Sequence, residues 1–456
     1  MTDTSQQPTP TSQLPGRWAP NRQWATVASM YVGYAMFMVL RMIPTVTGPA
    51  MREDATLDID LGVLGRIFAL GTCGAVVGKF VGGLAADRWG GKWTFTVGLL
   101  LSVAFIGLFS VSTEVWMFQA TLFMALLAKS FGWPSMAKII GNWFRADHYG
   151  RVWGVLSTSS RVGTLVATFG LGALLAVMPW RLLLAVAAGA GVLAVVYFAC
   201  TLREHPDDPL DVGPGDAAGG GHPLARLPLS TVTWGWETDS ATVRMGWAGA
   251  LPYFFSSRQF WLITGSLMGL TVLWDFLLFV PLYLKDTLSL TVSQASMAAS
   301  AFPLGSLISV LVGGYVFDRL TREQAARVFS LLLTCATGCV ATFLLMPHLG
   351  LSGGALTALS VGLLFLFGVC VSPCYYIPMS VFSIEFGGPH SGFLIALLDA
   401  IAFGGNALFY WFAGEIAEAS WQLFLVVLLT VSVVSLVLTY LFLRGETGRL
   451  AEASDG

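Results

Sequence analysis

The chain has 456 residues, of which 55% are hydrophobic and 11% are charged, and its mean hydropathy is +0.72. Soluble domains carry about 25% charged residues, so this composition excludes a large soluble protein, whose surface so few charges would not cover. The formal net charge is −2, and this balance gives no reason to expect a nucleic-acid partner.

Apolar stretches long enough to cross a bilayer as helices recur along the chain, and about twelve such spans are expected. Residues 1–22 are polar and are expected to form a tail, because they lack the apolar core of a secretory signal. The spans of the first half are expected near residues 24–48, 61–86, 93–112, 114–143, 150–177 and 180–202.

Residues 203–258 divide the expected spans into two groups. They contain the string HPDDPLDVGPGDAAGGGHP, whose Pro, Gly and Asp content is typical of a linker. The spans of the second half are expected near residues 260–284, 293–317, 327–346, 353–382, 392–415 and 420–443, with a tail over 445–456. The sequence therefore predicts an all-α membrane protein with an N-terminal bundle over 23–202 and a C-terminal bundle over 259–444.

Basic residues collect in the short loops on one side of the expected membrane. These loops contain Arg88, Lys92, Arg145, Arg151, Arg319, Arg322 and Arg327, whereas the loops on the other side are acidic overall. Short cytoplasmic loops are enriched in Lys and Arg, so both tails and the linker are predicted to be cytoplasmic. We expect a multi-pass, monomeric protein of the inner cell membrane, surrounded by the lipid bilayer.

One short string occurs at matching points of the two halves. Residues 82–92 read GGLAADRWGGK, and residues 313–319 read GGYVFDR. Each copy follows a long apolar run and contains an Asp-Arg pair, but only the first continues to Gly-x-Lys. A loop repeated in this way indicates a duplicated helical unit, and hence two pseudo-symmetric halves of a membrane transporter.

The first copy fits the pattern GxxxDRxGxK between the second and third spans, and it resembles the signature loop of the major facilitator superfamily. This resemblance covers nearly the whole chain and implies two six-helix bundles around a central cavity that opens alternately to each side. It also implies that the loop acts as a latch for one conformation; the alternative is an ordinary loop with its charges in water. The positions concerned are Gly83, Asp87, Arg88, Gly90, Lys92, Asp318 and Arg319.

Further strings resemble the organophosphate:phosphate antiporters, which include the glycerol-3-phosphate and glucose-6-phosphate translocases. They are FGWPSMAKIIGNWF at 131–144, HPDDPLDVG at 205–213 and PLYLKD at 281–286. The resemblance implies that the first, fourth and fifth spans line the cavity of the N-terminal bundle.

Four basic residues lie deep in the spans of the first half: Arg41, Lys79, Lys129 and Arg161. Ionisable groups at such depth are costly and are functional candidates by default. A cluster of cations in one cavity requires an anion, and Arg offers a planar fork that matches phosphate or carboxylate. We predict that these residues bind the substrate; the alternative for each is a cation that only packs between helices.

The deep charges of the second half are acidic, namely Asp275 and Asp399. The resembled antiporters have an arginine near the position of Leu273, so their two-arginine clamp is incomplete here. We expect both aspartates to serve coupling or gating. Three functional roles are open to them: they could pair with Arg41 or Arg161 in the absence of substrate, carry a proton, or bind the cationic end of a zwitterion. The alternative is that they only pack between helices or cap them.

Cys335 with Cys339, and Cys370 with Cys374, have a spacing that would suit a metal pair, but small packing residues are the expected interpretation, with no metal and no cofactor. No nucleophile–base motif or phosphate-binding loop stands out, so an enzyme is not expected.

We predict a secondary active transporter of a small organic anion, either an organophosphate with phosphate or a carboxylate. Phosphate or a proton would be the coupled species. One alternative is a proton-coupled exporter of zwitterionic or amphipathic compounds, and another is a transporter-like sensor of sugar phosphates.

Overall fold

The structure is a computed structural model that describes residues 20–144, 149–204, 247–317, 319–387 and 390–454. Most of the predicted N-terminal tail, residues 205–246 of the predicted linker, and Asp318 lie outside these ranges.

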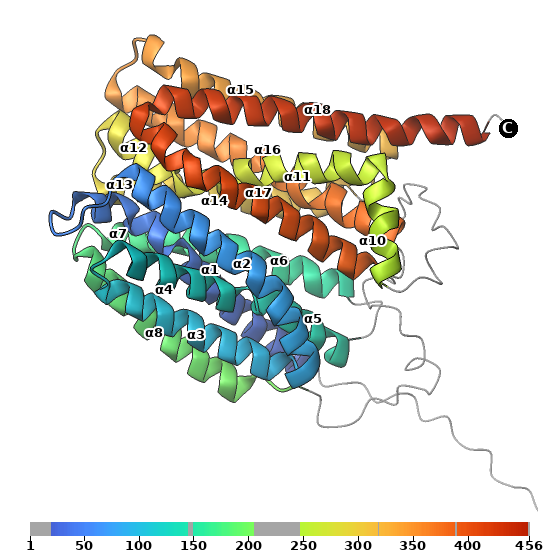
Figure 1. Ribbon diagram of the computed structural model, residues 1–456, viewed down its shortest axis with the longest axis horizontal. Helices are drawn as coiled ribbons and strands as arrows, with labels where there is room; N and C mark the ends of the chain where they lie inside the picture. The colour runs from blue at the N-terminus through green and yellow to red at the C-terminus, as the bar shows by residue number, and fades with distance from the viewer. Residues whose placement is uncertain (1–19, 145–148, 205–246, 318, 388–389, 455–456) are drawn as a thin grey trace, which may run out of the picture.

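The first half of the chain folds into helices that run nearly parallel to the long axis of the molecule (Figure 1). Their bounds are α1 Pro20–Glu53, α2 Leu61–Trp89, α3 Gly91–Val111, α4 Val115–Lys129, α5 Gly132–Trp143, α6 Tyr149–Leu165, the π-helix η2 Val166–Leu171, α7 Gly172–Leu174 and α8 Trp180–Thr201. The sharp turn from α2 to α3 is made by Gly90, whose φ of 84° is a conformation that side chains with a Cβ rarely adopt.

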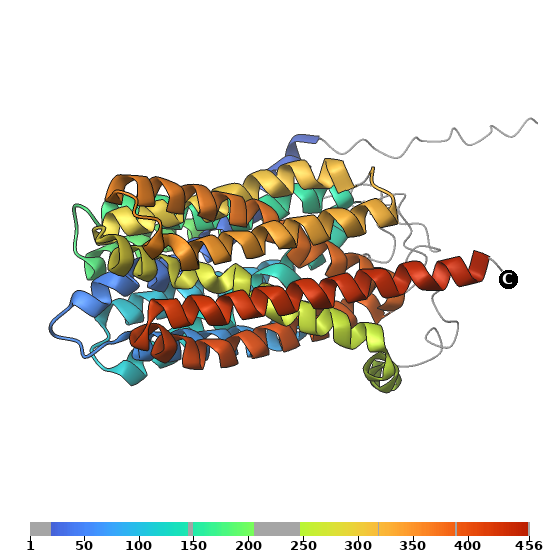
Figure 2. The ribbon, with the colours of Figure 1, turned by 90° about the horizontal axis from the view of Figure 1, so that it is seen from above.

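The second half begins with a short helix that lies across the end of the others and is seen end-on in Figure 2. The bounds are α10 Trp247–Ser256, α11 Arg258–Asp275, the 3₁₀ turn η4 Phe276–Leu278, α12 Val280–Leu288, α13 Val292–Ala299, α14 Ala301–Phe317, α15 Arg322–Leu345, the 3₁₀ turn η5 Met346–His348, α16 Gly353–Gly387, α17 Ser391–Ala419 and α18 Trp421–Ser454. We call the right-hand end of the molecule in Figure 1 the α10 end and the left-hand end the α12 end.

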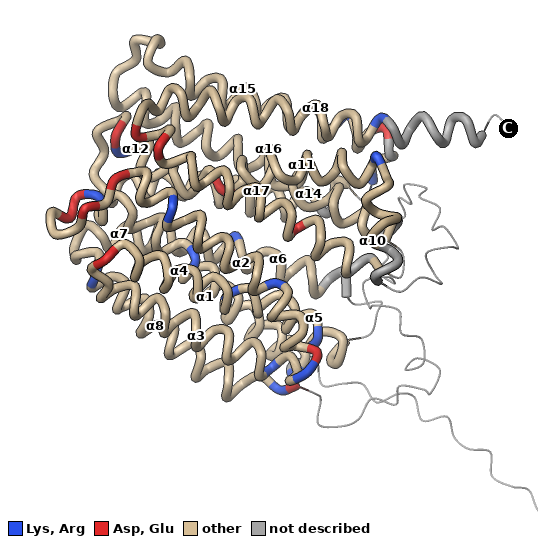
Figure 3. The backbone as a smooth tube through the Cα atoms, in the orientation of Figure 1, with Lys and Arg blue, Asp and Glu red and all other residues tan. Residues whose placement is uncertain are grey.

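The prediction of an all-α membrane protein is confirmed. Eleven helices in the described ranges are long and apolar enough to cross a membrane. The fifth predicted span is also helical, over α6, η2 and α7, but the π-helix interrupts it. Charged residues gather at the two ends of the molecule, and few lie between them (Figure 3).

Two local expectations differ from the structure. The predicted linker 203–258 contains α10, an apolar helix of ten residues. The predicted tail from residue 445 continues α18 as far as Ser454, because its Leu, Ala, Glu and Arg residues favour a helix.

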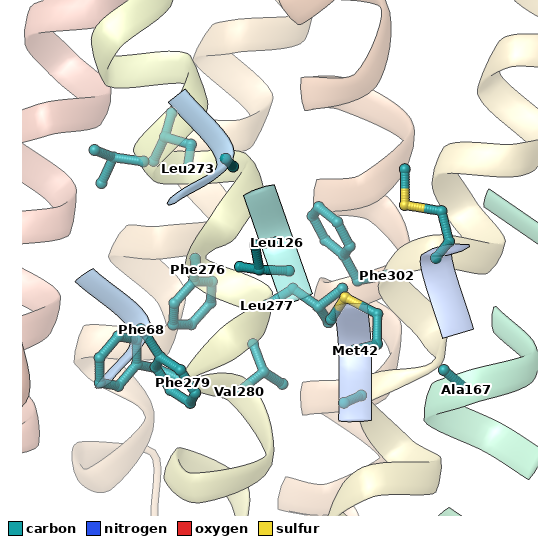
Figure 4. Packing of buried hydrophobic residues seen from close by; sticks show 14 of the residues in the cluster. Met42, Phe68, Leu126, Ala167, Leu273, Phe276, Leu277, Phe279, Val280 and Phe302 are labelled. Atoms are coloured by element: carbon teal, nitrogen blue, oxygen red, sulfur yellow. The ribbon is translucent and has the colours of Figure 1, made fainter. Parts of the chain in front are cut away.

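The two halves pack against each other through α2 with α17 and through α6 with α14. Apolar side chains fill the contact at mid-depth, where Phe68 of α2 meets Phe279 edge to face with 5.9 Å between ring centroids (Figure 4). This packing brings the deep cations of the first half to the deep carboxylates of the second.

Candidate functional site

An ion pair between Arg41 and Asp275 joins the two halves at the centre of the molecule. Nη2 of Arg41 on α1 lies 2.8 Å from Oδ1 and 3.1 Å from Oδ2 of Asp275, the last residue of α11. The Asp275 side chain is only 3% exposed, and that of Arg41 is 16% exposed. A buried carboxylate needs further donors to offset its lost hydration, and Asn406 of α17 supplies one at 2.7 Å.

A second pair joins α2 to α17. Lys79 donates a hydrogen bond to Oδ2 of Asp399, and its ammonium lies 4.1 Å from the centroid of the Phe403 ring. Tyr375 of α16 donates to the other carboxylate oxygen at 3.4 Å. Both deep aspartates are therefore held by cations of the other half. Arg41 was an expected partner for Asp275, whereas the pairing of Lys79 with Asp399 was not predicted.

Arg161 contacts no carboxylate among the residues that the structure describes. Its Nη1 donates to the Ser157 carbonyl oxygen at 3.0 Å and to the Ser160 hydroxyl at 2.8 Å, both on its own helix. The guanidinium lies 5.3 Å from the Trp274 ring centroid and 5.5 Å from that of Tyr376, as in cation–π contacts. Its buried Nε has no hydrogen-bond partner within the described ranges. The guanidinium therefore retains the capacity to bind an anion.

Lys129 is the second of the four deep cations that has no carboxylate partner in the described part of the chain. Its ammonium is 5.9 Å from the ring centroid of Tyr34, and it lines the same cavity as Lys79. The substrate-binding role of Lys129 stays a prediction.

Two small cavities meet at Arg41. One, of about 20 Å³, is also lined by Arg161, Trp274 and Asp275. The other, of about 50 Å³, is also lined by Lys79 and Lys129. These volumes hold at most a few water molecules, so a substrate must displace side chains to enter.

The charge around these cavities is unbalanced. Among the residues that the structure describes, Arg41 pairs with Asp275 and Lys79 pairs with Asp399, whereas Lys129 and Arg161 have no carboxylate partner. With all six groups ionised, two positive charges are left over, and a ligand with two negative charges neutralises them.

The α12 end of the molecule is closed by charge pairs between the halves. They are Arg52 with Asp286 at 2.6 Å, Arg52 with Glu418 at 3.6 Å, Arg66 with Glu415 at 2.8 Å and Lys285 with Glu53 at 2.6 Å. Beneath them α2 and α17 approach so closely that a Cβ on Gly414 would lie 2.0 Å from the Leu61 carbonyl oxygen.

The loop after α1 is ordered at the same end by Asp54. Its carboxylate accepts hydrogen bonds from the side chain of Thr56 at 2.6 Å, from the Thr56 backbone at 3.1 Å and from the Trp180 indole at 3.1 Å. The hydrogen bonds from Thr56 are the main reason that the pKa of Asp54 lies below its ordinary value, and Trp180 and the nearby Arg181 lower it further.

The repeated loop lies at the α10 end. Asp87 is 79% exposed and lies 3.6 Å from Lys138 of α5, in its own half. Arg88 is exposed and Gly83 faces open space. In the second copy, Arg319 is exposed and donates its backbone N–H to Val316, and Asp318 is outside the described residues. The latch role of these residues stays a prediction.

Three residues with a possible functional role were not predicted from the sequence. Glu204, just after α8, accepts hydrogen bonds from the backbone of Gly91 at 2.8 Å and Lys92 at 2.5 Å, and so caps α3 beside the repeated loop. Asn406 and Tyr410 of α17 both bond to Asp275, the latter through its hydroxyl to the backbone oxygen at 2.9 Å. Asn406 could have been identified from the sequence, because a polar residue two helical turns after Asp399 lies on the same face of the helix.

Cys370 and Cys374 lie one helical turn apart in α16. Cys374 donates its thiol to the Cys370 carbonyl within α16, and both are buried. In the described ranges there is no group of three or more His, Cys, Asp or Glu residues that could hold a metal.

Comparison with known families gives a match to the profile described as Major Facilitator Superfamily, over residues 30–383 and 276–455. The chain is 23% identical to the membrane sensor protein UhpC of Escherichia coli (strain K12) over 93% of this chain and 92% of that protein. It is 25% identical to the glucose-6-phosphate exchanger SLC37A2 of Bos taurus, over 76% of this chain and 74% of that protein. A probable hexose phosphate transport protein of Chlamydia trachomatis is 24% identical over 65% and 64%. These relatives confirm the resemblance to the organophosphate:phosphate antiporters.

Solved structures agree on the fold. A bacterial homologue of the human lysosomal transporter Spinster, in an inward-facing and unoccupied conformation, aligns with a TM-score of 0.69 at 12% identity, covering 94% of this chain and 98% of that one. A mutant of the nucleoside transporter NupG aligns with a TM-score of 0.68 at 14% identity, covering 93% and 99%.

Proposed function

This chain belongs to the major facilitator superfamily, and we propose that it carries a small organic dianion, of the phosphate monoester class, across the membrane by alternating access. Membership of a transporter superfamily places it among membrane transport proteins rather than enzymes. The observation that carries the substrate proposal is the excess of basic over acidic side chains at the cavities around Arg41, four against two among the described residues.

A phosphate monoester suits this site in both charge and geometry. Its second pKa is about 6, so it carries about two negative charges near neutral pH. Arg41 and Arg161 line the same cavity, and guanidinium groups bind phosphate oxygens with parallel hydrogen bonds. The names of two relatives, a glucose-6-phosphate exchanger and a probable hexose phosphate transport protein, support the same class. A dicarboxylate has the same charge and is the second choice.

The ion pairs suggest how binding is coupled to movement. Substrate oxygens compete with Asp275 for Arg41 and with Asp399 for Lys79, and each pair joins one half of the protein to the other. Breaking both pairs removes two of the ionic contacts between the halves and so favours their rocking, although the pairs at the α12 end must open as well. A ligand shifts a conformational equilibrium only through different contacts in the two states. The replacement of the carboxylates by substrate oxygens as partners of Arg41 and Lys79 supplies that difference.

We place the protein in the inner cell membrane with both termini and the α10 end in the cytoplasm, from the basic loops described above. Phosphate is the proposed counter-substrate, and a proton on a released aspartate is the second choice. A zwitterion exporter is less well supported, because both aspartates that would bind the cationic group already have a basic partner.

Uptake into proteoliposomes tests the proposal. Vesicles loaded with phosphate should accumulate radiolabelled glucose 6-phosphate, and Arg41→Ala should abolish uptake while the protein still inserts. Arg327→Ala, which removes an exposed arginine of α15, is the matched control and should retain uptake. Normal uptake by Arg41→Ala would contradict the proposal.

A sensor is the second candidate function, because one relative that spans nearly the whole chain is a membrane sensor protein. It would use the same site to bind a sugar phosphate and would signal to a partner. Saturable binding of glucose 6-phosphate without any flux into the vesicles would favour this function over transport.

A further inference from the structure

A larger pocket lies at the α10 end of the second half. It has a volume of about 800 Å³, and its lining residues come from α10, α11, α16 and α18 and the residue that joins α10 to α11. They differ from those of the two cavities around Arg41. This volume falls in the range of pockets that bind small organic ligands, so an occupant of that size is expected.

The walls of this pocket are of two kinds. Arg258, near the start of α11, and Arg444 of α18 supply positive charge. Leu262, Phe386 and Leu441 supply an apolar surface. A pocket that offers arginines and aliphatic or aromatic side chains together fits a ligand with an anionic head and an apolar body.

Gln259 adds a hydrogen-bond acceptor to the basic and apolar walls of the pocket. It lines the pocket and is only 8% exposed, and its Oε1 accepts no hydrogen bond from any described residue. A buried polar atom without a partner is costly, so a ligand that donates a hydrogen bond at this position would be favoured. The ligand therefore needs a hydroxyl or ammonium group beside its anionic group.

The surroundings place the pocket at the surface of the bilayer. Trp261 is 53% exposed and donates its indole N–H to the Phe255 carbonyl oxygen at 2.8 Å, and Phe255 is 39% exposed. Exposed aromatic residues with a polar handle collect where lipid headgroups meet the hydrocarbon core. The apolar helix α10 crosses the ends of the membrane-spanning helices at the same level (Figure 2).

We propose that this pocket binds a phospholipid whose headgroup carries a hydrogen-bond donor. The phosphate ester would contact Arg258 and Arg444, a hydroxyl or ammonium group would donate to Gln259, and the start of the acyl chains would lie on Leu262 and Leu441. The proposal uses no residue of the transport site and does not depend on the proposed substrate.

Native mass spectrometry of the purified protein, equilibrated with defined lipids, tests the proposal. Phosphatidylethanolamine and phosphatidylglycerol should be retained about tenfold more than phosphatidylcholine, which lacks the donor, a ratio that pairing one buried acceptor can give. Diacylglycerol, which lacks the phosphate, should not be retained.

Variants separate the two contacts. Arg258→Gln should lose retention of all phospholipids, whereas Gln259→Leu should lose only the preference over phosphatidylcholine. Arg327→Gln, at an exposed arginine of α15, is the matched control and should bind as wild type. Each variant is compared after size-exclusion chromatography shows a monodisperse protein.

Soluble glycerol 3-phosphate distinguishes the two possible sources of a phosphate ester. Displacement of lipid by glycerol 3-phosphate at equal concentration would mean that the pocket is a free-phosphate site and would overturn the lipid proposal. Equal retention of phosphatidylethanolamine and phosphatidylcholine by wild type, or unchanged retention in folded Arg258→Gln, would also overturn it.

Discussion

Replacing Asp275 with Asn should lower the thermal stability of the substrate-free protein and raise its affinity for a phosphate monoester. The substitution keeps the size of the side chain, and Asn406 can still donate to the remaining oxygen. The hydrogen bond from Tyr410 goes to the backbone oxygen and is unaffected. The change therefore removes mainly the negative charge beside Arg41.

The size of both effects follows from the geometry of the pair. At the observed 2.8 Å, Coulomb's law with an effective dielectric constant of about 20 gives an attraction of about 6 kcal/mol before desolvation is subtracted. Removing one partner of a buried pair costs about 3–5 kcal/mol, and the lower value is expected because Arg41 keeps 16% exposure. The ligand no longer has to displace a carboxylate, so its Kd should fall by about tenfold to hundredfold.

Thermal unfolding of the purified protein, with and without glucose 6-phosphate, measures both quantities. The variant should have the lower Tm without ligand and the larger rise in Tm with ligand. Glu323→Gln, which removes an exposed carboxylate of α15, is the control and should leave the ligand-induced rise unchanged. A folded Asp275→Asn variant with equal or weaker affinity would refute the competition between substrate and carboxylate.

Three further predictions concern the ends of the molecule. Gly414→Leu should abolish uptake, because its Cβ would lie 2.0 Å from a backbone oxygen of α2, whereas Gly404→Leu, in open space on the same helix, should leave uptake unchanged. The pKa of Asp54 is depressed chiefly by hydrogen bonds from Thr56. The Asp54 carboxylate therefore stabilises the loop fully above the pKa of about 4 that it has in the unfolded chain, and this stabilisation is lost as the pH falls through its lower pKa in the folded protein. The protection factors of the amides in this loop should fall on acidification, and Asp54→Asn should show the low protection already at neutral pH. Glu204→Gln should lower the free energy of unfolding by about 1 kcal/mol through loss of the α3 cap, measured by denaturant titration, with the substrate Kd unchanged.

Much of the fold could be predicted from the sequence because the bilayer demands long apolar helices. The same demand makes a deep charge conspicuous, and so Arg41, Lys79, Asp275 and Asp399 were all recognisable before their positions in space were known. The depth of a residue in its own span follows from counting residues, since a helix rises about 1.5 Å per residue.

The pairing of these charges could not be predicted. Arg41 and Asp275 are 234 positions apart, and Lys79 and Asp399 are 320 apart, so their contact depends on how the two halves pack. Glu204 is a similar case, because its role as a cap depends on the end of α8 returning to the start of α3. Hydropathy gives no information on such contacts between distant segments.

The central claim is that the site selects a ligand by two negative charges, and binding of three related sugars tests it most directly. Calorimetric titration of the purified protein should compare glucose, glucose 6-sulfate and glucose 6-phosphate, which carry zero, one and about two negative charges near neutral pH. The account predicts that the phosphate binds at least about tenfold more tightly than the sulfate, and that glucose does not bind measurably. Equal affinity for the sulfate and the phosphate, or tight binding of glucose, would contradict it.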